Sequence, residues 1–114
     1  MRRGELWWVD FPEPVGSETG YYRPAIIVQD LNIPAIVFGT VLVVPLTSTL
    51  RLASQRTCIR LDRGDTGLRH DSCAVVPHLV SIASIRVEEF IGTLSDDLMA
   101  EIDVAMMMVL GLIP

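Results

Sequence analysis

Polar side chains stand at the ends of two apolar segments of this chain. Arg23 precedes the apolar run 24–28, and Thr47 and Ser48 follow the apolar run 43–46. Short runs of this kind are typical of buried strands. If the two ends meet at one edge of a small sheet, the guanidinium group and the hydroxyl groups can bind one phosphate together. The pattern therefore predicts a site that acts on phosphodiesters.

A small, mainly β fold is expected to position these groups. Strands are predicted at residues 5–11, 23–29, 40–46, 57–61 and 73–76, with 80–83 continuing the last strand or pairing nearby. Residues 36–38 are expected to form a short ordered segment within the connection 30–39, and residues 62–67 a turn. Short strands at this spacing favour an all-β barrel or a strongly bent sheet. The strands that carry Arg23 and Thr47 are expected to be central.

One helix is predicted at the C-terminal end of the chain. Ser95 is a good N-cap, Asp96 and Asp97 suit the first turn, and the helix should run to about residue 110. An apolar stripe at helical spacing should pack on the sheet: Leu98, Ile102, Ala105, Met106 and Val109. Met107, Met108 and Leu112 widen the stripe beyond one face, so part of the helix is expected at a dimer seam or a partner groove.

The size and composition of the chain indicate one compact domain over residues 1–114. Half of its residues are hydrophobic, a high share for a short chain, which favours burial of some apolar surface against a second copy. We therefore expect a homodimer. Between residues 13 and 22, two glycines and several hydroxyl side chains without apolar periodicity predict a surface loop, and loops of this length are often functional.

The charge balance excludes one class of function. The net charge is −5, which argues against non-specific binding of long nucleic acids, because such binding depends on many cationic contacts to phosphates. The net charge does not exclude a local basic site. All nine cationic side chains are arginine, and five of them cluster in the middle third of the chain: Arg51, Arg56, Arg60, Arg63 and Arg69.

A cytoplasmic location is expected. The longest apolar stretch, 31–46, is interrupted by polar, glycine and proline residues, so no membrane span is predicted, and the first residues lack a signal-like apolar core. Cys58 and Cys73 lack the paired spacing of a zinc site, so we interpret both as buried, free thiols. No metal site or cofactor is predicted, and His70 is interpreted as a loop residue.

Several short motifs, in order along the chain, resemble the MazF/PemK family of bacterial toxin endoribonucleases. The motifs are Arg3-Gly4-Glu5-Leu6-Trp7 with Val9-Asp10, Gly16-Ser17-Glu18, Arg23-Pro24-Ala25, Val43-Val44-Pro45-Leu46-Thr47-Ser48, Gly67-Leu68 with Asp71-Ser72, and Gly92-Thr93-Leu94-Ser95. The resemblance implies an SH3-like barrel with a C-terminal helix, of the CcdB/PemK type. It also implies a symmetric dimer that cuts single-stranded RNA at short sequences without a metal, and an antitoxin whose acidic tail occupies the RNA groove.

The resemblance assigns roles to individual residues. Arg23 and Thr47 match the family's catalytic arginine and threonine, and Glu18 matches a loop glutamate that assists in some members. A guanidinium suits charge stabilisation on phosphate oxygens when the 2′-hydroxyl attacks the neighbouring phosphorus. Glu18 could take the proton of that hydroxyl, although an unperturbed carboxylate is a weak base.

Contacts to RNA are expected from Ser17, Tyr21, Ser48 and His78. At His78 the chain departs from the family, which usually carries a Gln-Ile-Arg-Thr-like segment where this chain has His78-Leu79-Val80-Ser81. Our hypothesis is that His78 partly replaces the missing polar contact.

Two other functions stay open on the sequence. CcdB-like toxins share the architecture but bind DNA gyrase through their C-terminal end, and the apolar segment 105–113 is compatible with that. The third possibility is a ribonuclease-derived interaction module without activity, which the departures at His78 and Val80 favour. Arg23, Thr47 and the Gly-Ser-Glu loop favour the ribonuclease.

Overall fold

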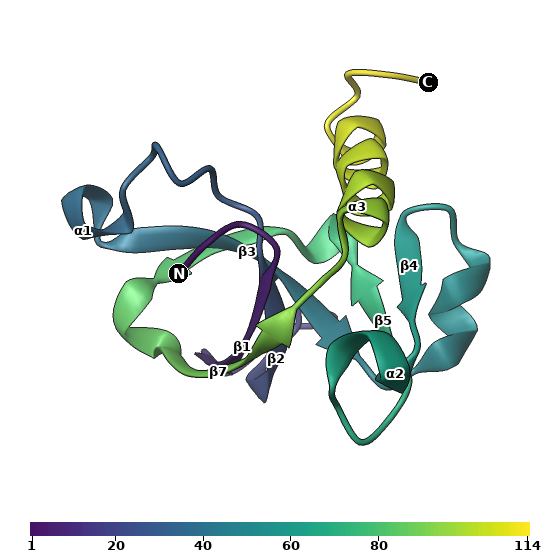
Figure 1. The fold of residues 1–114 in the computed structure, drawn as a ribbon, viewed down its shortest axis with the longest axis horizontal. Helices are drawn as coiled ribbons and strands as arrows, with labels where there is room; N and C mark the ends of the chain where they lie inside the picture. Colours follow the sequence, from purple (N-terminus) through teal and green to yellow (C-terminus); the bar gives the residue numbers. More distant parts are fainter.

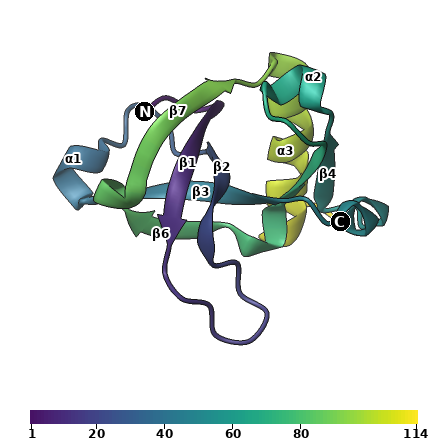
Figure 2. The ribbon, with the colours of Figure 1, turned by 90° about the horizontal axis from the view of Figure 1, so that it is seen from below.

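The computed structural model describes all 114 residues as a strongly bent, mainly antiparallel sheet with one long helix (Figures 1 and 2). Its strands are β1 (Glu5–Phe11), β2 (Tyr21–Ile27), β3 (Thr40–Thr47), β4 (Cys58–Leu61), β5 (Ser72–Val75), β6 (Val80–Ala83) and β7 (Val87–Thr93). Its α-helices are α1 (Ala35–Phe38), α2 (Arg63–Thr66) and α3 (Asp96–Val109). Short 3-10 segments are η1 (Leu50–Ser54), η2 (Val76–His78) and η3 (Ser84–Arg86). The predicted fold class, a small SH3-like barrel with a C-terminal helix, is confirmed.

The strand β3 organises the sheet. The strand order is β4-β5-β3-β2-β1-β7, so β3 and β2 are central, as predicted. One edge of β3 pairs with β2, while its other edge pairs first with β6 and then, at Leu46 and Thr47, with β5. Because β3 leaves one partner and joins another along its length, the sheet bends around it and closes toward a barrel.

Two apolar cores lie on the two faces of the bent sheet. The larger contains Leu6, Ile26, Val44 and Leu46 and is covered by α3, which supplies Ile102 and its neighbours. The smaller contains Val9, Phe11, Ala25, Ile27, Val41, Val43 and Ile82. Consecutive residues of β2 and β3 alternate between the cores, which is the period of two expected of strands buried on both faces.

The helix α3 agrees with its predicted N-cap and presents most of its predicted apolar stripe to the core. The Ser95 hydroxyl accepts a hydrogen bond from the Leu98 backbone N–H at 3.2 Å, as an N-cap does. Met99 is buried with Ile102 and Ala105, whereas Val109 is 37% exposed. The prediction that Val109 packs on the sheet was therefore wrong, because the helix leaves the sheet before its last turn (Figure 1).

Three other differences from the sequence predictions concern where one strand begins and which short elements are present. The strand β2 begins at Tyr21 rather than Arg23, because Tyr21 and Tyr22 pair with Phe11 and Asp10 of β1. The turn predicted at 62–67 contains the single-turn helix α2. The strand β7 was not predicted, since its adjacent acids Glu88 and Glu89 are exposed and hide the strand pattern.

Cys58 and Cys73 are buried free thiols, as predicted. No helix of the chain is long and apolar enough to cross a membrane.

Candidate RNA-cleavage site

The pairing of β2 with β3 brings Arg23 to the end of β3. Ala25 pairs with Pro45, and the same register continued by two residues sets Arg23 across from Thr47. The half-buried Arg23 guanidinium donates from Nε to the Gly20 carbonyl at 2.8 Å and from Nη1 to the Leu46 carbonyl at 3.3 Å. Its Nη2 has no hydrogen-bond partner within the chain. Arg23 is therefore held by main-chain oxygens while donor capacity remains for a ligand.

The hydroxyl groups at the end of β3 lie in the same groove. Thr47 Oγ1 accepts a hydrogen bond from the Thr49 backbone N–H at 3.2 Å, so its hydroxyl hydrogen is free to donate. Ser48 is exposed beside it. The predicted meeting of Arg23 with Thr47 and Ser48 thus occurs in the structure.

These residues line a hollow that we call the central groove. Its volume is about 780 Å³, which is in the range of small-molecule sites. It is lined by Trp8, Tyr22, Arg23, Pro24, Leu46, Thr47, Ser48, Thr49, Gly67, Leu68, Arg69, His70, Ser72, Glu89, Phe90 and Ile91. Arg23 and Thr47 come from the two central strands, and the walls come from the sheet edge at β7 and from the loop before β5.

One wall of the central groove is aromatic and acidic. The rings of Trp8 and Tyr22 are stacked, with centroids 5.2 Å apart and an interplanar angle of 11°. Partial desolvation raises the pKa of the Tyr22 hydroxyl, and the negative charges of Glu88, Glu89 and Asp10 raise this pKa further. These three carboxylates give this side of the groove negative charge.

The opposite wall is basic and is held by Asp71. The carboxylate of Asp71 accepts from the Arg63 backbone N–H at 2.9 Å and from Arg60 Nη2 at 3.1 Å. The hydrogen bond from the Arg63 backbone and the nearby arginine charges lower the pKa of Asp71. These contacts fasten the loop that carries Arg69 and His70, whose side chains have no hydrogen-bond partner within the chain and line the groove.

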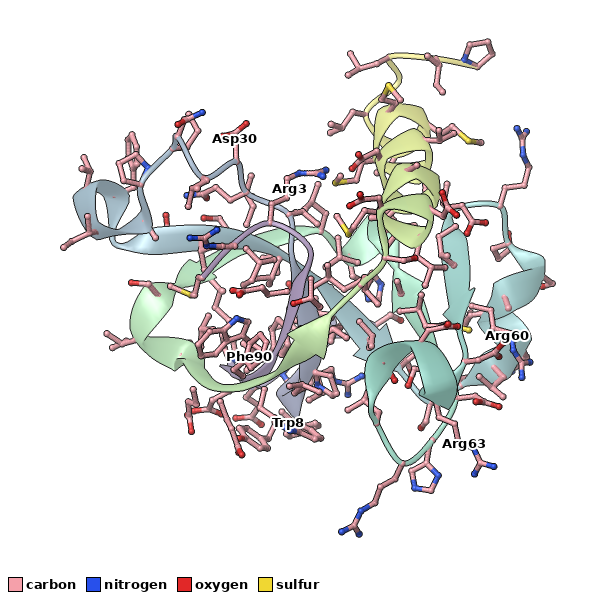
Figure 3. The ribbon with its side chains drawn as sticks, in the orientation of Figure 1. Arg3, Trp8, Asp30, Arg60, Arg63 and Phe90 are labelled. Atoms are coloured by element: carbon pink, nitrogen blue, oxygen red, sulfur yellow. The ribbon has the colours of Figure 1, made fainter.

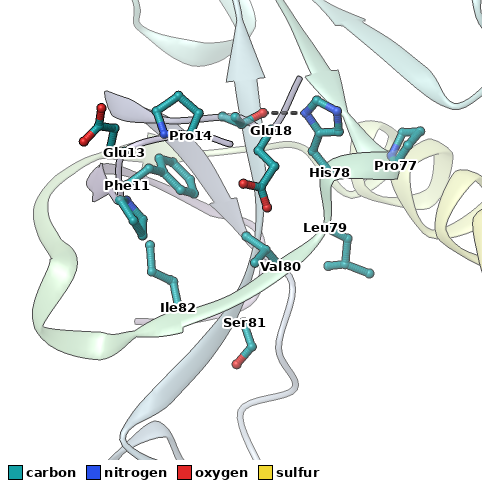
Figure 4. A pocket seen from close by; sticks show the side chains of 12 residues that line it. Phe11, Glu13, Pro14, Glu18, Pro77, His78, Leu79, Val80, Ser81 and Ile82 are labelled. Carbon is teal, nitrogen blue, oxygen red and sulfur yellow. Dashed lines mark hydrogen bonds between the residues drawn. The ribbon is translucent and has the colours of Figure 1, made fainter. Parts of the chain in front are cut away.

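Glu18 and His78 lie in a separate hollow, which we call the loop pocket (Figure 4). It is lined by Phe11, Pro12, Glu13, Pro14, Glu18, Thr19, Pro77, His78, Leu79, Val80, Ser81 and Ile82. Glu18 Oε1 accepts from the Val15 backbone N–H at 2.8 Å, and the Glu18 N–H donates to the Val15 carbonyl at 3.2 Å. The structure therefore does not bring Glu18 together with Arg23 and Thr47.

The half-buried His78 fastens the loop between β1 and β2, which projects from the sheet (Figure 2). His78 Nδ1 and Thr19 Oγ1 share a hydrogen bond of 2.5 Å. The next residue, Gly20, accepts the hydrogen bond from Arg23. A Cβ at Gly20 would lie 2.3 Å from Pro14 Cδ, so only glycine fits there. The two hollows are thus linked through the backbone of residues 19 and 20.

Of the other predicted RNA contacts, Ser17 lies in this loop and Tyr21 is the first residue of β2. Ser17 is exposed, and Tyr21 is 64% exposed with a φ of 67°, a left-handed conformation that is uncommon for a tyrosine. Neither residue lines the central groove.

Sequence reasoning missed several groove residues. Trp8 and Glu89 reach the groove because they are cross-strand partners between β1 and β7, and β7 was not predicted. His70 was correctly placed in a loop, but its place in the groove that also contains Thr47 depends on how that loop folds back. No group of three or more His, Cys, Asp or Glu side chains is arranged to hold a metal ion.

The model of one protein family matches residues 2–110: the PemK-like, MazF-like toxins of type II toxin-antitoxin systems. The chain belongs to this family. The predicted resemblance is therefore confirmed over nearly the whole chain.

Two curated relatives match this chain over nearly their whole length. Endoribonuclease MazF9 of Mycobacterium tuberculosis (strain ATCC 25618 / H37Rv) is 34% identical over 116 residues, which cover 98% of each chain. Endoribonuclease EndoA of Bacillus subtilis (strain 168) is 28% identical over 113 residues, covering 99% of this chain and 97% of EndoA.

Solved structures show that the toxin fold is shared. The crystal structure of MazF (Form-I) from Deinococcus radiodurans superposes with a TM-score of 0.82 at 23% identity, covering 97% of this chain and 96% of that chain. A mycobacterial endoribonuclease in complex with its cognate antitoxin gives a TM-score of 0.77 at 19% identity, covering 100% of this chain and 98% of that chain.

Proposed function

We propose that this chain is an endoribonuclease toxin that cleaves single-stranded RNA at short, selected sequences. The observation that carries the proposal is the convergence of Arg23 and Thr47 in the central groove. Family membership and the two curated relatives, both endoribonucleases, support the same activity.

The proposed reaction needs no metal. The ribose 2′-hydroxyl attacks the adjacent phosphorus, and the bond from phosphorus to the 5′-oxygen of the next nucleotide breaks. A base removes the proton of the 2′-hydroxyl, and the leaving 5′-oxygen takes up a proton. The products are a 2′,3′-cyclic phosphate and a 5′-hydroxyl.

Arg23 is proposed to stabilise the charge that develops on the non-bridging phosphate oxygens. Its main-chain contacts fix the guanidinium before RNA binds, and preorganised donors are the most effective form of such stabilisation. The Thr47 and Ser48 hydroxyls would donate to the same phosphate or orient the leaving oxygen.

Glu18 is proposed as the general base. In the structure its carboxylate is hydrogen-bonded to the Val15 N–H in the loop pocket, so this role requires the loop to rearrange when RNA binds. Such rearrangements of active-site loops are common. RNA bound over the loop would meet the exposed Ser17 and Tyr21 and reach His78.

Two partners complete the proposal. A cognate antitoxin with an acidic segment would compete with RNA for Arg23, Arg69 and His70, and the protein would act as a homodimer in the cytoplasm. The solved complex of a mycobacterial endoribonuclease with its antitoxin, on the same fold, supports the first of these.

The test is incubation of the purified protein with a long single-stranded RNA in EDTA, with Arg23→Ala in parallel. Recurrent cuts with cyclic phosphate ends that disappear in the variant are the expected result. Arg51→Ala is the matched control, because Arg51 is exposed and lies outside the groove. Absence of cutting by folded wild-type protein would overturn the proposal, and gyrase inhibition and partner capture would then be the next assays.

A further inference from the structure

One wall of the central groove is basic and the other is aromatic and acidic, and this difference would orient a bound nucleic acid. Arg69 and His70 form one wall, and the adjoining hollow at Ser48 is lined by Arg63 as well. The stacked Trp8 and Tyr22 lie on the other side. Trp8 on β1 and Arg63 on α2 lie at the same lower rim of the molecule (Figure 3). A strand bound in the groove would set its phosphates along the basic wall and its bases along the aromatic wall.

The aromatic wall offers a stacking surface beside Arg23. Tyr22 is the sequence neighbour of Arg23 and is 50% exposed, so the ring face that does not contact Trp8 is available. Unpaired bases of single-stranded RNA stack on exposed aromatic side chains in this way. Because Arg23 is proposed to hold the scissile phosphate, the stacked base would belong to a nucleotide that flanks it.

Glu89 adds a carboxylate to the same wall. It pairs with Trp8 across β1 and β7, so the two residues are direct cross-strand neighbours. Both line the groove, and neither the Glu89 carboxylate nor the Trp8 indole N–H has a hydrogen-bond partner within the chain. Two carboxylate oxygens are acceptors without donors, and the indole is a donor only.

We propose that Trp8, Tyr22 and Glu89 form a base-binding subsite that selects guanine at a nucleotide flanking the cleavage site. Guanine presents two adjacent donors on its Watson–Crick edge, N1–H and the N2 amino group, which match the two oxygens of one carboxylate. Adenine, cytosine and uracil each place an acceptor beside their donor, and a carboxylate would repel that acceptor.

This inference rests on the proposed function for its ligand class, but binding tests it without cleavage. A pool of single-stranded 2′-O-methyl RNA oligonucleotides with a randomised centre is incubated with the protein, and bound molecules are sequenced. The 2′-O-methyl group prevents attack by the 2′-oxygen, so base preference is read from binding alone. Cleavage of the unmodified pool in EDTA is measured separately, so failure of the proposed function shows only in that second arm.

Glu89→Gln and Glu88→Gln make a matched pair, because both remove one charge from β7 but Glu88 does not line the groove. Wild-type protein is expected to enrich guanine at one position. Glu89→Gln is expected to lower that enrichment about 5- to 150-fold, which is the range for the loss of one bidentate base contact. Glu88→Gln is expected to preserve the enrichment. Tyr22→Ala should weaken binding of the pool by a similar factor, and Tyr22→Phe should restore it.

Two results would overturn the inference. One is a wild-type profile without guanine enrichment at any position. The other is an equal loss of enrichment in Glu89→Gln and Glu88→Gln, which would show a general charge effect. Far-UV circular dichroism establishes that each variant is folded.

Discussion

At the scale of the residue, Arg23 shows how main-chain oxygens position a functional cation. Gly20 and Leu46, from the loop before β2 and from the end of β3, each supply a carbonyl that accepts a guanidinium hydrogen bond. No carboxylate pairs with Arg23, so its positive charge is not cancelled within the site. Such a guanidinium is available to a phosphate without first breaking an ion pair.

Glu18 carries the residue-scale prediction. Since an amide cannot accept the 2′-hydroxyl proton, Glu18→Gln is expected to lower kcat about 10²- to 10⁴-fold with little change in KM. Steady-state kinetics on one RNA oligonucleotide measure both constants. Glu13→Gln is the control, because Glu13 is another acid of the loop pocket. If kcat of Glu18→Gln equals that of the control, Glu18 is not the base, and His70 becomes the next residue to test.

At the scale of the element, the loop between α2 and β5 is a wall of the groove that depends on one carboxylate. Asp71 joins the backbone of α2 to the side chain of Arg60 on β4. The ionised carboxylate makes both contacts, and they are the reason its pKa is lowered. The order of Arg69 and His70 at the groove therefore depends on the charge of their neighbour.

The pH dependence of stability tests this contact. Because the folded pKa of Asp71 is lowered, the ionised carboxylate stabilises the fold at pH above its unfolded value, near ~3.9, and this contribution is lost as pH falls through the folded pKa. Asp71→Asn should have a lower Tm than wild type at neutral pH, and the two should converge in acid. Asp65→Asn, on the exposed face of α2, should show no such convergence. Parallel Tm curves for wild type and Asp71→Asn would contradict the assignment.

The helix α3 provides a second element-scale prediction. Ile102 is fully buried against the sheet, while Val109 is 37% exposed in the last turn. Ile102→Ala should therefore lower the free energy of unfolding by about 2–5 kcal/mol, and Val109→Ala should change it by about 0.5 kcal/mol or less. Urea denaturation of both variants measures this difference. Equal effects would mean that Val109 is buried in solution, as it would be in a dimer seam.

At the scale of the whole molecule, the surface carries apolar side chains that the single chain does not cover. One group surrounds α1: Leu31, Ile33, Ile36, Val37 and Phe38. The other lies on the second half of α3 and beyond it: Val104, Met107, Val109, Leu110, Leu112 and Ile113. The segment before α1 and the end of α3 both lie at the upper side of the molecule in Figure 1. Exposed apolar surface of this extent favours association with a second copy.

Sedimentation velocity over a range of concentrations tests the dimer. We expect the mass of two chains for the wild-type protein and of one chain for Leu112→Asp, because a carboxylate buried in an apolar seam without a partner opposes association. Val15→Asp is the control, since Val15 is an equally apolar, 78% exposed residue on the distant loop between β1 and β2. A wild-type protein that sediments as one chain at micromolar concentration would rule the dimer out.

The sequence by itself determined the features that depend on neighbours along the chain. The alternation in β1, the apolar runs of β2 and β3 and the Ser95 cap of α3 are local signals, and they placed Arg23 in β2 and Thr47 at the end of β3. Only the tertiary structure decided which side chains share a hollow, because that depends on the register between strands far apart in sequence. The pairing of β2 with β3 joined Arg23 to Thr47, and the pairing of β1 with β7 brought Glu89 beside Trp8. Hydrogen bonds within the loop placed Glu18 in a different pocket, a result that no local pattern encodes.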